Sequence, residues 1–137
     1  MTVSTDASKT GIPNSSLNNL VHQKILLVNI NAAATDVAQI INLPAKYRIT
    51  KFQPYDASKT LAASLATLGL FTAAAGGGTA LVALATLTAL TTPQQFIDMT
   101  LAVPTTYRTE TTLFIRNVVA DGTAGTISVL FEYIDLT

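Results

Sequence analysis

The chain has 137 residues, a length that suits one domain and is too short for two independent hydrophobic cores. Its eight basic residues are scattered and are balanced by eight acidic residues, which argues against a surface that binds nucleic acid. Cysteine is absent, which excludes disulfides, thiolate metal sites and cysteine nucleophiles.

Residues 1–20 are predicted to form an extended N-terminal arm. They are mostly small and polar, contain Gly11 and Pro13, and follow neither a helical nor a strand period. Such a segment is either a disordered tail or an arm that orders by lying across a neighbouring subunit. It lacks the basic start and apolar run of a signal peptide, so we expect synthesis in the cytoplasm.

Residues 21–137 are predicted to form one antiparallel β-sandwich domain, so the expected fold class is all-β. Short apolar runs rich in β-branched and aromatic residues are separated by Pro, Gly, Asn and Asp about every ten residues, which is typical of sandwiches and barrels. The predicted strands are Lys24–Asn31, Val37–Leu43, Tyr47–Gln53, Ala62–Ala73, Ile97–Val103, Leu113–Val119 and Thr126–Ile134.

Two of these strands carry distinctive patterns. The run Ile25–Ile30 is almost continuously apolar, as in a strand covered on both faces by its own domain or by a partner. The strand predicted at Ile97–Val103 alternates apolar and other residues and is bracketed by Pro93 and Pro104, which argues against a helix there.

An uncharged stretch between Lys59 and Asp98 is harder to interpret. Three glycines, Gly76–Gly78, interrupt it, and residues 79–92 fit a short helix, a strand or a loop. We expect no membrane span here, because Ala, Thr and Gly predominate and the glycines would leave backbone groups unsatisfied in lipid.

The last two strands are predicted to form a hairpin around Asp121 and Gly122, a dipeptide that supplies the positive φ angles of a tight turn. In the final strand one face is wholly apolar and is predicted to enter the core. Its residues are Ile127, Val129, Phe131 and Tyr133.

Lys46, Arg48 and Lys51 form a small basic cluster, in which strand periodicity places Lys51 on the face opposite the other two. We interpret the cluster as a solvated strand edge that discourages further strand pairing.

No residue pattern predicts a catalytic, cofactor-binding or metal site, so the protein is predicted not to be an enzyme. His22 is the single histidine and has no apparent catalytic partner. Asp98, Glu110 and Glu132 lie in or near predicted strands, but their spacing specifies no acid and base pair. The three glycines lack the Lys-Ser/Thr sequence that completes a phosphate loop.

The composition favours a protein that works by association. Charged residues make up 12% of the chain and apolar residues 49%, with zero net charge, so little repulsion keeps copies apart. We therefore expect much of the surface to be covered by partner proteins.

Three segments resemble small virion proteins of tailed bacteriophages: Leu43–Ile49, Leu68–Thr72 before the glycines, and the ending from Leu113–Arg116 to Thr126–Val129. This resemblance covers about residues 24–136 and implies a β-sandwich or jelly-roll protein that decorates or cements the capsid. It also implies a homotrimer on the capsid exterior that binds the major capsid protein. The charge distribution, the composition and the lack of motifs predict that the protein binds no nucleic acid, membrane or cofactor.

Two alternatives remain open at this point. The first is a tail, neck or head-fibre component of the same particle. The second is a small carbohydrate-binding domain, for which Tyr47, Tyr55 and Tyr107 are the candidate aromatic residues.

Overall fold

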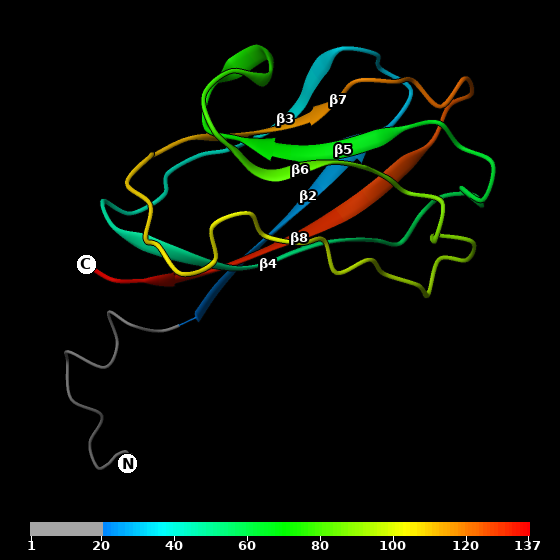
Figure 1. The fold of residues 1–137 in the computed structure, drawn as a ribbon. Coiled ribbons are helices and arrows are strands. Elements are labelled where there is room, and N and C mark those ends of the chain that lie inside the picture. The colour runs from blue at the N-terminus through cyan, green and yellow to red at the C-terminus, as the bar shows by residue number, and fades with distance from the viewer. Residues whose placement is uncertain (1–20) are drawn as a thin grey trace, which may run out of the picture.

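A computed structural model describes residues 21–137, which form two antiparallel β-sheets packed face to face (Figure 1). The arm predicted at residues 1–20 lies outside the described residues. The elements are β2 Val21–Asn29, β3 Thr35–Ile40, β4 Tyr47–Tyr55, β5 Thr67–Phe71, the 3-10 turn η1 Ala74–Gly76, β6 Ala80–Thr86, β7 Leu113–Asn117 and β8 Thr126–Asp135. No helix among these residues is long and apolar enough to cross a membrane.

The strands pair in a nested order along the chain: the first pairs with the last, the second with the last but one, and so on. One sheet has the order β2-β8-β4 and the other β3-β7-β5-β6, so β2 pairs with β8, β3 with β7 and β5 with β6. The fourth pair joins β4 to the irregular segment 96–108, through bridges at Phe96 and Arg108. This is the winding of a jelly roll, and it confirms the predicted all-β sandwich.

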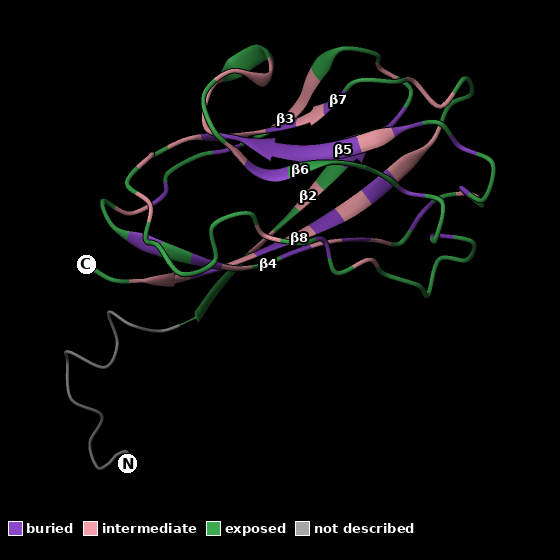
Figure 2. Ribbon diagram, in the orientation of Figure 1, coloured by how far each residue is buried: buried purple, intermediate pink, exposed green. Residues whose placement is uncertain are grey.

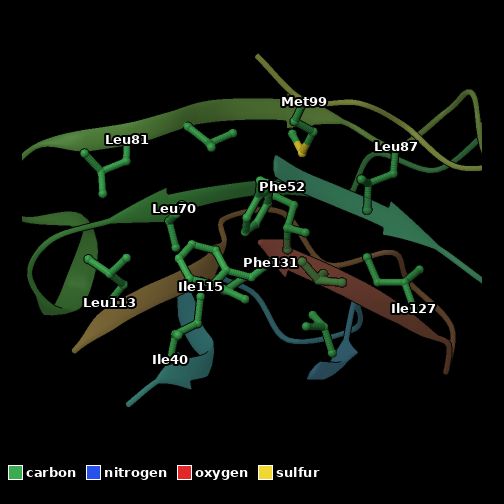
Figure 3. Close-up of a cluster of buried hydrophobic side chains, with 14 of the residues drawn as sticks. Ile40, Phe52, Leu70, Leu81, Leu87, Met99, Leu113, Ile115, Ile127 and Phe131 are labelled. Carbon is green, nitrogen blue, oxygen red and sulfur yellow. The ribbon is translucent and has the colours of Figure 1, made fainter. Parts of the chain in front are cut away.

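The core lies between the two sheets and contains side chains from both (Figure 3). In β8, Ile127, Val129 and Phe131 are fully buried, whereas the residues between them are partly exposed (Figure 2). The predicted register of this strand is therefore confirmed. From the opposite sheet, the fully buried Leu70 and Ile115 enter the same cluster.

The strand predicted at Ile97–Val103 is wrong. The Ile97 N–H donates to the Pro54 carbonyl at 2.9 Å, but the Ala102 N–H donates to the Leu81 carbonyl at 2.8 Å. Because Pro54 belongs to one sheet and Leu81 to the other, the segment changes partner sheet partway and cannot maintain one ladder. It nevertheless lies beside β4, in the position that the remaining strand would occupy in a regular eight-stranded jelly roll.

The hairpin predicted around Asp121 and Gly122 is also wrong, because β7 and β8 belong to different sheets. Gly122 does have a positive φ of 99°, as the turn signal indicated. The residues between the strands, however, cross from one sheet to the other instead of closing a two-stranded turn. Both strands have one apolar face, which suits packing face to face as well as pairing edge to edge.

The uncharged stretch contains a β-hairpin. Residues 80–86 form β6, which pairs with β5, and the glycine-rich loop joins the two strands. Gly76 and Gly78 have positive φ angles of 74° and 68°, a backbone conformation that favours glycine. The strand predicted at Ala62–Ala73 forms only over β5, because the Ser64 N–H donates to the Leu61 carbonyl in a turn.

Candidate functional site

The polar residues considered for chemistry are dispersed. Within residues 21–137, no three His, Cys, Asp or Glu side chains gather into a possible metal site. The His22 ring stacks on Tyr133 with centroids 5.3 Å apart. The three carboxylates have different partners: Asp98 accepts from Gln53, Glu110 from Arg108 and Glu132 from Thr50. This arrangement gives no reason to assign a reaction to these residues.

The outer face of the four-stranded sheet is partly covered by the chain itself. The loop between β5 and β6 folds back over it (Figure 1). The Ala75 N–H in this loop donates to Asp36 Oδ2 at 2.9 Å. Asp36 also pairs with Arg116, Oδ1 to Nη1 3.4 Å. Phe71, whose ladder partner Phe114 faces outward, is only 8% exposed. The loop and the burial of Phe71 reduce the apolar surface on this face, where Leu84 of β6 stays 39% exposed.

The outer face of the three-stranded sheet is not covered in this way. Its central cross-strand rows are Leu27–Ser128–Tyr55 and Ile25–Leu130–Gln53. Ile25 is 65% exposed and Leu27 71% exposed, and β2 lies at the surface along most of its length (Figure 2). The apolar run Ile25–Ile30 was predicted to be covered either by its own domain or by a partner. None of the described residues covers Ile25 and Leu27 on this face, so the first explanation is wrong here. Cover by a partner stays a prediction.

A shallow groove extends this apolar area beyond β4. Its volume is about 220 Å³, and it is lined by Gln53, Tyr55, Gln94, Phe96 and Leu130. Phe96 is 62% exposed and shares the outer face with Tyr55, its bridge partner. We call the area formed by Ile25, Leu27, Tyr55, Phe96 and Leu130 the apolar patch.

A polar half, formed by Gln23, Arg48, Lys51 and Glu132, adjoins the apolar patch on the same face. A β-bulge at Thr50 shifts the register of β4, so Lys51 pairs with Glu132 and lies on the same face as Arg48. The predicted opposite placement of Lys51 is therefore wrong, because a bulge breaks the two-residue period. Lys51 Nζ lies 3.8 Å from Glu132 Oε1, and Gln23 Nε2 donates to Glu132 Oε2 at 3.2 Å.

The three tyrosines proposed for sugar binding do not share a groove. Tyr47 is fully buried, and its hydroxyl donates to the Glu110 carbonyl at 2.8 Å. Burial raises the pKa of the Tyr47 phenol. Tyr107 lies under the Lys46 ammonium, 5.1 Å from ring centroid to Nζ, and only Tyr55 belongs to the apolar patch.

Sequence reasoning identified part of this face. The apolar run at Ile25–Ile30 signalled a covered strand, and Tyr55 was named for its ring. The alternation in the last strand placed Leu130 on the face opposite the core, whereas Phe96 was missed because it lies beside residues that belong to the core. The exposure of Phe96 follows from strand pairing, which a single sequence does not specify.

The comparisons with known proteins are few. No family model matches the sequence, and no curated protein matches it. Among solved structures, the chain is similar to one described as "Cyanophage Pam1 capsid asymmetric unit", with a TM-score of 0.54 and 17% sequence identity. The similarity covers 90% of this chain and 91% of that chain, so the two share a fold over nearly their whole length.

Proposed function

We propose that the chain is a non-enzymatic structural protein of a bacteriophage virion, specifically a decoration or cement protein on the outside of the capsid. The observation that carries the proposal is the apolar patch on the outer face of the three-stranded sheet. The shared fold with a chain from a cyanophage capsid asymmetric unit supports it. The partner we propose for the patch is the major capsid protein.

The energetics favour a multivalent attachment. Ile25, Leu27 and Phe96 are 65%, 71% and 62% exposed, so covering them would contribute about 3 to 6 kcal/mol. Association itself costs about 4 to 15 kcal/mol in lost freedom. One copy would therefore bind weakly, whereas a homotrimer that presents three patches gains affinity through effective concentration.

The polar half of the face suits a role in orientation. Arg48 and Lys51 are exposed beside the apolar patch, as charged residues are at the rim of an interface, and Lys51 lies next to the largely buried Glu132 carboxylate. Rim charges select the correct partner and register more than they add affinity. Attachment should therefore weaken moderately, but persist, at high salt.

The proposal is tested with capsids from a virus in which this gene is disrupted. Purified wild-type protein should cosediment with these capsids to saturation, and Phe96→Glu should weaken binding at least about tenfold, since a charge would be desolvated in the contact. The matched control is Leu65→Glu in the β4–β5 connection, where the side chain is 70% exposed but lies off the sheet face.

The control variant should bind like the wild type. Equal binding by Phe96→Glu and the wild type would show that the apolar patch is not the surface that attaches to the capsid. Binding to isolated tails instead of shells would replace the decoration function with that of a tail component.

A further inference from the structure

The four edge strands of the two sheets differ in how well they are protected. β3 has six residues and a bulge after Asp36, which shortens its regular edge. β4 is covered by segment 96–108, through hydrogen bonds that Ile97 and Met99 donate to it. β6 has register shifts and accepts a hydrogen bond at Leu81 from Ala102. Bulges, short length and covering segments are the usual means of preventing strand addition.

β2 has none of these protections among the described residues. Its nine residues pair with β8 without a register shift, and none of the strands within residues 21–137 pairs with its other edge. It contains no proline, and its basic and acidic residues are His22 and Lys24. Alternate residues of such an edge leave N–H and C=O groups available to a further strand.

We propose that residues 14–20 of a neighbouring copy add to this edge of β2 as an extra strand. The occupant is a segment of the chain that lies outside the described residues, and it ends at Leu20, directly before β2 begins at Val21. It follows Pro13, so every residue of the segment has an N–H to donate. Seven extended residues span about 23 Å, against about 30 Å for β2.

The chemistry of the segment matches the surface that it would cover. Residues 10–20 carry no charge, so the segment can lie beside Ile25 and Leu27 without desolvating an ion. Leu17 and Leu20 supply apolar side chains in a segment that is otherwise polar. The strand would extend the three-stranded sheet by one and cover part of its exposed apolar edge.

Geometry favours a second copy over the same chain. Val21 pairs with Ile134 near the end of β8, so β2 begins at a corner of the sheet. A segment that continued in the direction of β2 would extend beyond its own domain, towards a neighbour. Returning along the same β2 edge requires a tight reversal at Asn18 and Asn19, and this is the competing arrangement that the experiment separates.

Cysteine cross-linking tests the proposal, because the natural chain contains no cysteine. Leu17→Cys is placed in one copy and Ile25→Cys in a copy of different length, so that a disulfide between the two variants gives a product of distinct mass. These positions are central in the segment and in β2, so they lie close for either strand direction. Paired strands bring Cβ atoms to about 5 Å, which allows a disulfide with small adjustment.

The mixed sample should form an interchain disulfide at least about tenfold faster than a control mixture of Leu17→Cys with Ala85→Cys, because pairing raises the effective concentration. Ala85 is exposed on β6, an edge strand of the other sheet. Ser15→Cys and Asn19→Cys repeat the test in shifted registers. Deleting residues 1–20 should in turn reduce the number of copies in the purified oligomer.

Three results would overturn the proposal. The first is a disulfide within one chain when a single copy carries both cysteines, which would assign the edge to the same chain. The second is rapid dimerisation of Ile25→Cys alone, which would pair β2 with β2. The third is no excess over the control for any of the three arm positions. The measurement uses purified protein without capsids, so its outcome is independent of the proposed capsid attachment.

Discussion

At the scale of single residues, Asp121 joins two distant connections. Its carboxylate, 5% exposed, pairs with the Lys59 ammonium and accepts a hydrogen bond from the Thr123 hydroxyl. Lys59 lies between β4 and β5, and Asp121 lies in the crossing from β7 to β8. The ion pair therefore fixes the connections that carry the chain between the sheets.

This pair predicts acid sensitivity. The hydrogen bond from Lys59 lowers the pKa of Asp121 from 3.8 to about 2. Because the pKa is lower in the folded than in the unfolded state, the carboxylate stabilises the protein above pH 4, and this stabilisation is lost as the pH falls towards 2. Urea unfolding at pH 7, 4 and 3 should show a steeper decline for the wild type than for Asp121→Asn. Parallel declines would contradict the assignment.

The register of β8 predicts which of its residues tolerates a charge. Phe131 is fully buried between the sheets, so Phe131→Asp should prevent folding, because an unpaired buried charge costs several kcal/mol out of about 5 to 15. Leu130→Asp, on the outer face of the same strand, should keep the β-type circular dichroism spectrum. A folded Phe131→Asp variant would show that the register is wrong.

The sequence predicts some residue positions and not others. The inward face of β8 was readable, because alternation along one strand is a local property. The fully buried Asn117 was not: its Nδ2 donates to the Ile30 and Ala32 carbonyls, and its Oδ1 accepts from the Thr67 N–H. Those partners lie 50 or more residues away, and nothing in the local sequence around Asn117 indicates them.

At the scale of elements, the sequence predicts strands better than it predicts their partners. Six of the seven predicted strands coincide at least partly with observed strands, whereas the segment Ile97–Val103 is irregular. Its alternation is real, but the segment passes from one sheet edge to the other. The Asp121–Gly122 signal likewise marked a turn without revealing that the strands on either side belong to different sheets.

The N-terminal arm and the domain should be separable. The described core cluster begins at Val28, so deleting residues 1–18 should leave the β-rich circular dichroism spectrum intact while weakening self-association and attachment to capsids. Circular dichroism and sedimentation of the truncated protein measure the two effects. Loss of the spectrum on truncation would show that the arm contributes to the core.

At the scale of the whole molecule, the two outer faces are unequal. One is partly covered by the β5–β6 loop, which Asp36 binds through the Ala75 N–H. The other carries the apolar patch and its polar half. Composition alone predicted a protein covered by partners, but which face remains bare depends on where one long loop folds back. That information lies in contacts across the sheets and not in any local pattern.

The most direct test of the account is a reconstruction, at near-atomic resolution, of the phage particles to which we propose that this chain belongs. We expect density for the jelly roll outside the shell, with Ile25, Leu27 and Phe96 covered by neighbouring protein. Absence of the chain from the particle, or its presence there with the apolar patch facing solvent, would contradict the central claim that this surface exists to bind other virion proteins.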